Sequence, residues 1–308
     1  MKVLVSGGSG FLGSALERSL VERGDAIVRL SRGAPNRASD VRWDPAARVL
    51  DPRPLAGLDA VVHLAGASIG ARRWSPAWKA TILESRREGT RFLSETLAAL
   101  DPPPRTLVSA SAIGYYGDRG DEALTEASPP GRGFLADVAR AWESATAPAE
   151  RAGMRVVHLR IGLVLDCGGG ALERLLTPFR LGVGGPLGNG RQWWSWIALE
   201  DLTAAMLHAL DRADLSGPIN AVAPAPVTNR EFARALGRAL RRPALLRAPA
   251  FALRLLLGRE RADELLLASQ RVTPRVLLDG GFGFRRPVLE EALDHALHAR
   301  APAGPGGA

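Results

Sequence analysis

The stretch VSGGSGFLG at residues 5–13 constrains the fold of this chain more than any other segment. It follows the apolar run Lys2 to Ser6 and leads into an amphipathic stretch from Phe11 to Arg23, which Gly24 closes. Glycines at positions 7, 10 and 13 permit a sharp turn between a strand and a helix, because glycine adopts positive φ at no steric cost. The segment therefore predicts a strand, a tight turn and a helix.

The same alternation continues along the chain. Four further apolar runs predict strands at Ala26 to Leu30, Asp59 to Leu64, Arg105 to Ser109 and Arg155 to Leu159. Helical patterns separate them near Trp78 to Leu100 and Leu135 to Ala152. Strands that alternate with helices predict an α/β protein with a Rossmann-type, doubly wound parallel sheet.

The composition changes after about residue 165, where Gly- and Pro-rich loops such as LGVGGPLGNG alternate with helical segments near Asn229 to Ala239 and Pro249 to Ser269. We expect residues 1–165, joined by 197–223, to form the sheet domain. Residues 166–196 and 224–297 are expected to form a smaller, mostly helical cap on the substrate side. Residues 298–308 are expected to be a disordered tail, and Asp201 to be the N-cap of a helix.

The glycine turn also predicts a ligand. Gly8, Gly10 and Gly13 satisfy G-x-G-x-x-G between a strand and a helix, the context in which this motif binds the pyrophosphate of a dinucleotide. Free N–H groups and the helix dipole would hold the anion, whereas the alternative is a tight turn without a ligand. The expected cofactor contacts in this loop are Gly7, Ser9, Gly10, Phe11, Leu12 and Gly13.

The end of the second predicted strand indicates which dinucleotide binds. An NAD site places an acid about 20 residues after the glycines, but no acid lies between Asp25 and Asp40. Ser31 and Arg32 stand there instead. A guanidinium suits a 2′-phosphate and contributes about 1.5–3 kcal/mol, which is roughly a 10- to 100-fold preference for NADP(H). An ordinary surface arginine is the alternative.

Other residues are expected beside the same cofactor. The HLAG segment, residues 63–66, ends the third predicted strand, and its small residues permit close approach of a ligand. Arg160 ends the fifth predicted strand, where an acid in the interior is an alternative partner for it. The expected cofactor contacts in this group are Leu64, Ala65, Gly66, Arg86, Ser109 and Arg160.

The chain resembles the extended, epimerase-like short-chain dehydrogenase/reductases over about residues 1–297. The matching motifs are GGSGFLG, LAG, SASAIGYYG and REGTRFL. Further motifs resemble the SDR39U-type subfamily with its distinctive C-terminal segment, among them RIGLVL, GNGRQWWSWI and GFGFRRP. The resemblance implies hydride transfer at a nicotinamide, with a Ser that polarises the substrate carbonyl, a Tyr that transfers the proton and a Lys that lowers the pKa of that Tyr. Extended members are often homodimers, and the sequence leaves the oligomeric state open.

Only part of this catalytic set is present. Ser111 matches the catalytic Ser, with a strand-end Ser that caps backbone groups as the alternative. No Tyr-x-x-x-Lys occurs anywhere, and Leu135 and Ala139 occupy its two positions. Tyr115 and Tyr116, in the loop after Ser111, are candidate replacements for the proton donor.

Aromatic and basic residues suggest a substrate side. RQWWSWI places Trp194 and Trp196 on one face if it is a strand, where the rings would either stack on a flat ligand or pack in the core. Arg72 and Trp74 follow HLAG and, with Gln192, are expected to contact a polar or anionic substrate. The predicted substrate residues are Arg72, Trp74, Gln192 and Trp194.

Composition excludes several classes of protein. The net charge of +8 comes almost entirely from scattered arginines, without the basic blocks and interleaved aromatics of nucleic-acid-binding proteins. No apolar run reaches 18 residues, so no membrane span is expected, and the glycines after residue 6 argue against a signal peptide. Cys167 is the single cysteine and the five histidines have no metal spacing, so we expect a cytoplasmic protein without a metal.

These observations favour two hypotheses over a third, a nucleic-acid-associated protein, which only the net positive charge supports. The first is an NADP(H)-dependent oxidoreductase or epimerase-like enzyme that acts on a small carbonyl or hydroxyl substrate. Epimerisation is the less favoured reaction, because it needs a competent base in both half-reactions. The second is an NADP(H)-binding regulator or scaffold without turnover, which the missing Tyr and Lys favour.

Overall fold

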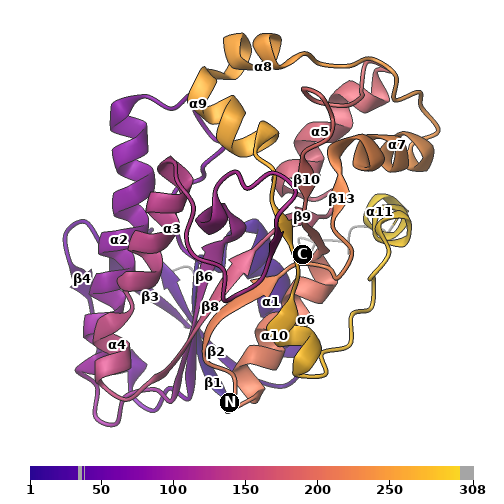
Figure 1. The fold of residues 1–308 in the computed structure, drawn as a ribbon. Helices are drawn as coiled ribbons and strands as arrows, with labels where there is room; N and C mark the ends of the chain where they lie inside the picture. Colours follow the sequence, from indigo (N-terminus) through magenta and orange to yellow (C-terminus); the bar gives the residue numbers. More distant parts are fainter. Residues whose placement is uncertain (34–36, 38, 299–308) are drawn as a thin grey trace.

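The computed structural model describes residues 1–33, 37 and 39–298 (Figure 1). Its centre is an eight-stranded sheet with the order β12-β8-β6-β5-β1-β2-β3-β4, parallel except for the β3–β4 pair. The strands are β1 (Lys2–Ser6), β2 (Ala26–Ser31), β3 (Asp40–Asp44), β4 (Val49–Leu50), β5 (Ala60–His63), β6 (Thr106–Ala112), β8 (Arg155–Ile161) and β12 (Gly217–Ala221). The predicted Rossmann-type sheet is therefore confirmed.

The strand order reverses at β1. Val3 lies level with Ile27 of β2 on one side and with Ala60 of β5 on the other. Val3, Leu4 and Val5 are fully buried because helices cover both faces of the sheet. In an open parallel sheet, ligands bind at the carboxyl ends of the strands where the order reverses. The fold therefore places the candidate site at the ends of β1 and β5.

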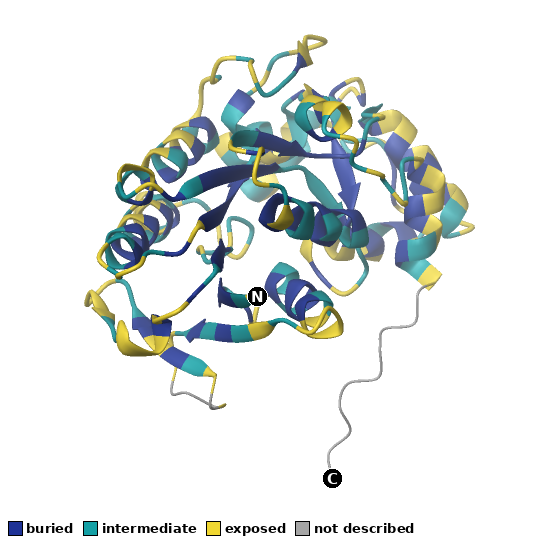
Figure 2. Cartoon of the chain, turned by 90° about the horizontal axis from the view of Figure 1, so that it is seen from below, coloured by how far each residue is buried: buried dark blue, intermediate teal, exposed yellow. Residues whose placement is uncertain are grey.

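Two layers of helices flank the sheet (Figure 1). One layer holds α2 (Pro76–Ala98), α3 (Phe134–Ser144) and α4 (Ala147–Arg151), and the other holds α1 (Phe11–Glu22), α6 (Leu199–Asp211) and α10 (Arg275–Asp279). Figure 2 shows buried strands between helices whose outer faces are exposed. An apolar cluster lies on each side of the sheet, with Leu16 and Leu202 in one and Phe92 and Leu97 in the other.

The cap lies above the carboxyl ends of the strands (Figure 1). Its helices are α5 (Gly170–Arg180), α7 (Asn229–Ala239), α8 (Ala250–Leu257), α9 (Arg259–Ala262) and α11 (Leu289–His298). Short strands form two-stranded sheets in or beside it: β7 (Ala123–Leu124), β9 (Leu163–Leu165), β10 (Trp193–Trp194), β11 (Trp196–Ala198), β13 (Val227–Thr228) and β14 (Arg271–Val272). Short helical turns complete the chain: η1 (Arg53–Leu55), η2 (Ile113–Tyr116) and η3 (Asp263–Leu267). A third apolar cluster, which includes Leu172, Trp196 and Phe232, holds the cap together.

Several local expectations need correction. The predicted helix at 135–152 is broken into α3 and α4, because Pro148 lies in the first turn of α4 and has no N–H to continue the first helix. The predicted helix at 249–269 is broken at Gly258, which has a φ of +89°. The sequence analysis did not predict the short strands β3 and β4.

The start of α6 and the end of α11 were also the subject of expectations from the sequence. The expectation that Asp201 caps α6 is wrong, because the N-cap is Ala198. The buried Asp201 carboxylate instead accepts hydrogen bonds from the backbone N–H groups of Arg285 and Arg286, at 2.7 and 2.9 Å. His298, the first residue of the expected tail, is the last residue of α11, and the rest of that tail, residues 299–308, lies outside the described residues.

None of the described helices combines the length and apolar character that a membrane span requires.

Candidate functional site

The glycine loop between β1 and α1 has the geometry of a ligand cradle. Gly7 has a φ of +75°, and a Cβ there would lie 3.0 Å from the backbone nitrogen of Ala65. A Cβ on Gly13 would lie 2.2 Å from the Gly7 carbonyl oxygen. Ser9 and Gly10 are exposed, and Gly10 is the N-cap of α1. The loop therefore brings backbone N–H groups to the surface where only glycine allows this close approach.

The residues predicted to choose between dinucleotides lie at the end of β2. Ser31 is the last residue of β2 and is half-buried, and Arg32 follows it and is exposed. Within the described residues, the Arg32 side chain makes no ion pair or hydrogen bond. Its guanidinium is therefore available to an anion at this edge of the cradle.

The segment after β5 lies against the glycine loop. The backbone N–H groups of Leu64 and Ala65 donate to the hydroxyl of Ser6, at 3.2 and 3.3 Å. His63 is fully buried, and its two ring nitrogens contact Ser6 Oγ at 2.6 Å and Thr90 Oγ1 at 2.8 Å. Burial, with a smaller effect of nearby Arg86, lowers the pKa of His63 to about 4. His63 is therefore a neutral structural link between β5 and α2.

Arg86, on α2, is a buried cation beside this segment. Its guanidinium donates to the carbonyl oxygens of Ala67 and Ile82, at 2.9 and 3.3 Å, and stacks on the Trp142 ring at 4.7 Å. A Cβ on Gly66 would lie 3.1 Å from the guanidinium carbon. Its Nε has no hydrogen-bond partner, and no carboxylate of the described residues pairs with it. Burial lowers the pKa of Arg86 to about 10.

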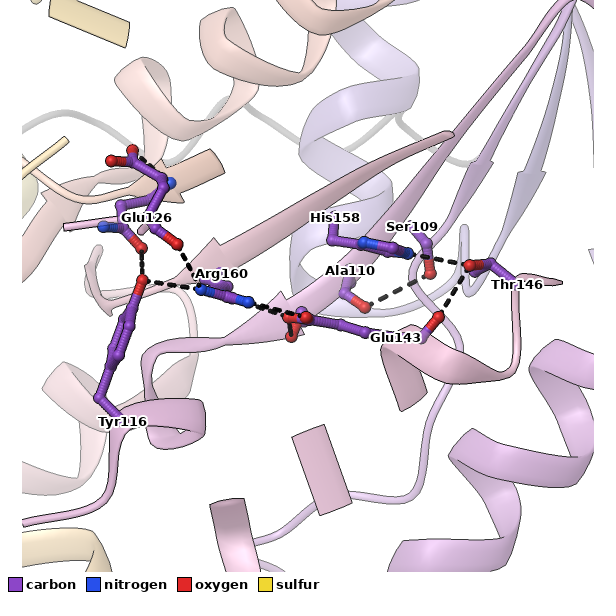
Figure 3. A network of polar contacts seen from close by, with 10 residues as sticks. Ser109, Ala110, Tyr116, Glu126, Glu143, Thr146, His158 and Arg160 are labelled. Atoms are coloured by element: carbon purple, nitrogen blue, oxygen red, sulfur yellow. Dashed lines mark hydrogen bonds and ion pairs between the residues drawn. The ribbon is translucent and has the colours of Figure 1, made fainter. Parts of the chain in front are cut away.

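A buried polar network occupies the ends of β6 and β8 (Figure 3). Ser111 and Arg160 are register partners on these strands. The Ser111 hydroxyl donates to Glu143 Oε1 at 2.7 Å, and Arg160 donates to both Glu143 oxygens at 2.8 and 2.9 Å. Burial alone would lower the pKa of Arg160, but the hydrogen bonds to Glu143 raise it above the usual value. The alternative expectation for Arg160, an acid partner in the interior, is confirmed.

The two tyrosines lie on the other side of Arg160. Tyr116 is fully buried; its hydroxyl donates to Asn220 Oδ1 at 2.7 Å and accepts from Arg160 at 3.0 Å. Burial raises the pKa of Tyr116 above its usual value. The Arg160 guanidinium lies 3.5 Å from the Tyr115 ring centroid. Ser109, also predicted in this region, is fully buried, and its hydroxyl donates to the Ala110 carbonyl at 3.4 Å.

Glu143 is the residue that the sequence analysis missed. Leu135, Ala139 and Glu143 follow one another at intervals of four residues in α3, so they share one face of the helix. Leu135 and Ala139 occupy the positions of the expected Tyr and Lys, and Glu143 lies one turn beyond them. The position of this carboxylate, four residues after Ala139, could have marked Glu143 as a candidate site residue from the sequence. Only the tertiary structure shows that it reaches Ser111.

The predicted substrate residues do not form one group. Trp74 donates from Nε1 to the Ile69 carbonyl at 3.0 Å, and Arg72 lies over the Trp78 ring at 4.9 Å. Gln192 is buried in the cap, where its amide donates to the carbonyl oxygens of Leu187 and Leu266. Trp194 packs on Phe232 with ring centroids 5.1 Å apart. Core packing, the alternative for this tryptophan, is therefore what the structure shows.

Titratable side chains form no metal site in the described part of the chain. No group of three or more His, Cys, Asp or Glu residues there is arranged to hold a metal ion.

Comparison with known families agrees with this geometry. Residues 3–222 match the NAD dependent epimerase/dehydratase family, and residues 248–296 match a domain of unknown function, DUF1731. Epimerase family protein Mb2239 of Mycobacterium bovis is 44% identical over 294 residues, which cover 96% of this chain and 97% of that protein. Human epimerase family protein SDR39U1 is 38% identical over 298 residues, which cover 95% of this chain and 98% of that protein.

Two solved structures are similar over nearly the whole chain. The crystal structure of human SDR39U1 with NADPH aligns with a TM-score of 0.88 at 37% identity, covering 97% of this chain and 100% of that one. A nucleoside-diphosphate sugar epimerase from Corynebacterium glutamicum aligns with a TM-score of 0.79 at 39% identity, covering 96% of this chain and 58% of that one.

Proposed function

The chain belongs to the NAD dependent epimerase/dehydratase family, and we propose that it binds NADP(H) and acts as an oxidoreductase or epimerase-like enzyme on a small carbonyl or hydroxyl substrate. The observation that carries this proposal is the glycine cradle at the point where the strand order reverses. A Cβ at Gly7 would clash with the backbone of Ala65, and one at Gly13 with the Gly7 carbonyl oxygen, so only glycine lets the loop take this shape. That human SDR39U1 was crystallised with NADPH supports the choice of cofactor.

The residues present fit a phosphorylated dinucleotide. The loop of Gly7, Gly10 and Gly13 would hold the pyrophosphate at the N-terminus of α1. Arg32 would pair with the 2′-phosphate, because its guanidinium makes no other polar contact among the described residues. Arg86 supplies a second cation, buried and without a carboxylate partner in the described chain, next to Gly66. When bound, the nicotinamide supplies the hydride donor or acceptor.

For proton transfer, the geometry favours Ser111 and Glu143. Ser111 already donates its hydroxyl hydrogen to Glu143, so its oxygen is left to accept a proton from a substrate hydroxyl as its own proton passes to the carboxylate. Reduction would use the reverse path. Arg160 fixes both oxygens of Glu143, so the acceptor is positioned before substrate arrives. Tyr116 is less suited to the predicted role of proton donor, because its hydroxyl is bonded on both sides.

A second candidate function rests on burial. Ser111 is 2% exposed and Tyr116 is 0% exposed, so neither hydroxyl is open to a substrate in this conformation. An NADP(H)-binding regulator or scaffold without turnover needs no such access. The two functions share the cofactor site and differ in whether NADPH is consumed.

Thermal-shift titrations with NADPH and NADH test the shared part first. Binding to the folded state raises stability by about 2.7 kcal/mol at 100 times the dissociation constant. Selective stabilisation by NADPH is expected, and no shift with either nucleotide would remove both candidate functions.

A panel of aldehydes and ketones with NADPH then separates the two candidates. Turnover that Ser111→Ala and Glu143→Gln abolish supports the enzyme. Ser94→Ala is the matched control, because it removes a buried hydroxyl on α2 that has no hydrogen-bond partner among the described residues. If Ser94→Ala retains the rate and Ser111→Ala also retains it, the proposed proton path is wrong.

We further propose that the protein is a cytoplasmic homodimer. Cys167 is the single cysteine of the sequence, which fits a reducing compartment, and extended members of the superfamily are often dimers. Light scattering is expected to give twice the chain mass of 32.7 kDa. A mass of one chain at micromolar concentration would exclude the dimer.

A further inference from the structure

Two guanidinium groups converge on one backbone carbonyl at the edge of the cap. The Gly70 carbonyl oxygen accepts hydrogen bonds from Arg174 at 2.5 Å and from Arg261 at 2.9 Å. Arg174 belongs to α5 and Arg261 to α9, whereas Gly70 lies in the loop between β5 and α2. Three segments distant in the sequence therefore bring two positive charges together.

These two charges have no anionic partner among the described residues. No carboxylate in that part of the chain forms an ion pair with Arg174 or Arg261, and the Arg261 Nε is buried without a hydrogen-bond partner. Burial, followed by the charge of Arg174, lowers the pKa of Arg261. Arg174 is exposed and Arg261 is half-buried, so water screens part of their repulsion, and the two guanidinium groups share the Gly70 carbonyl as acceptor.

The carboxylates closest to Arg261 in the sequence pair with other cations. Glu260 precedes Arg261 in α9, yet it pairs with Lys79 of α2 at 2.6 Å. Asp263 follows two residues later and pairs with Arg254 at 2.7 Å. The acids on both sides of Arg261 are thus directed to other cations, which leaves this guanidinium free for an external anion.

The position of the pair links it to the cofactor cradle. A Cβ on Gly169 or Gly170 would meet the Phe11 ring at 2.7 or 3.3 Å, so the start of α5 packs on the first residue of α1. Arg174 lies one turn further along α5. The two guanidinium groups therefore belong to cap helices, one of which begins against the first residue of the helix that follows the glycine loop.

We propose that Arg174 and Arg261 form a binding site for a phosphoryl group of the substrate, with the Gly70 carbonyl holding the two guanidinium groups in place until it binds. A phosphoryl group offers three acceptor oxygens and two negative charges, which suit two guanidinium groups approaching from different helices. The substrate class is then a phosphorylated small carbonyl or hydroxyl compound. This inference rests on the proposed function, because it assigns the anion to the substrate of that site.

The test uses the whole chain, saturated with NADPH. Inorganic phosphate is the probe. Phosphate is titrated at constant ionic strength, and binding is followed by calorimetry. Arg174→Gln and Arg261→Gln are each expected to weaken phosphate binding at least 10-fold. Arg259→Gln is the matched control, because its side chain lies two residues from Arg261 and is 86% exposed. An equal loss in Arg259→Gln, or no phosphate binding by the unaltered protein, overturns the proposal.

A second titration identifies the source of the phosphoryl group. NADPH affinity of the same variants is measured without phosphate. Unchanged affinity supports a substrate site, whereas a 10-fold loss assigns the pair to a phosphate of the cofactor and overturns the proposal. A protein that binds NADPH but not phosphate contradicts this inference alone, and a protein that does not bind NADPH contradicts the proposed function.

Discussion

Replacing Glu143 by Gln tests the buried network most directly. The substitution keeps the side-chain shape but removes the charge that faces Arg160, which is 3% exposed. Removal of one partner from a buried ion pair costs about 3–5 kcal/mol, because the other charge stays buried without compensation. We therefore expect Glu143→Gln to be among the most destabilising conservative substitutions in this chain.

The chain length converts this cost to a melting temperature. For 308 residues, an unfolding entropy of roughly 2.1 cal/mol/K per residue gives roughly 0.65 kcal/mol/K, so Tm falls by about 5–8 °C. Differential scanning calorimetry without cofactor measures this fall. Asp137→Asn is the matched control on the same helix, because Asp137 pairs with Arg140 and both side chains are more than half exposed. An exposed pair contributes about 0–1 kcal/mol.

The double variant Glu143→Gln/Arg160→Gln completes the cycle. With both charges removed, no buried charge is left unpaired, so part of the lost stability is expected to return. The reasoning is refuted if Glu143→Gln lowers Tm no more than Asp137→Asn does. It is also refuted if the double variant is as unstable as the two single losses added together.

Three further predictions concern the cradle, the choice of cofactor and pH. Gly13→Ala places a Cβ 2.2 Å from the Gly7 carbonyl oxygen. The substitution is therefore expected to lower stability by more than about 1 kcal/mol, measured by thermal melting, and to weaken NADPH binding, measured by fluorescence titration. Unchanged stability and unchanged NADPH affinity would contradict the clash. Arg32→Ser is expected to weaken NADPH binding by roughly 10- to 100-fold while leaving NADH binding unchanged, and an equal effect on both nucleotides would exclude the 2′-phosphate as the partner. Burial lowers the pKa of His63 from its usual 6.5 to about 4 in the folded protein. The unfolded chain therefore binds more protons between these values, and stability falls with decreasing pH, by up to about 3 kcal/mol at pH 4 and below. Urea unfolding between pH 7 and 4 measures this slope, which His63→Asn should remove.

The sequence by itself determined the sheet domain and the cofactor cradle. Glycine spacing and the apolar run before it specify a strand, a turn and a helix through short-range backbone sterics, which do not depend on distant residues. The predicted first strand, Lys2 to Ser6, is observed with the same bounds. The missing acid after β2 is likewise a local feature, because the position lies at a fixed distance along the chain from the glycines.

Tertiary structure alone decided which polar side chains meet. Glu143 reaches Ser111 across 32 residues, and Arg174 and Arg261 meet at Gly70 across 104 and 191 residues. Spacing in the sequence cannot encode these contacts, since they depend on how α3, α5 and α9 pack against the ends of the strands. The same packing decides that Gln192 and Trp194 lie within the cap. Local sterics thus set the cradle, and long-range packing sets the charges that surround it.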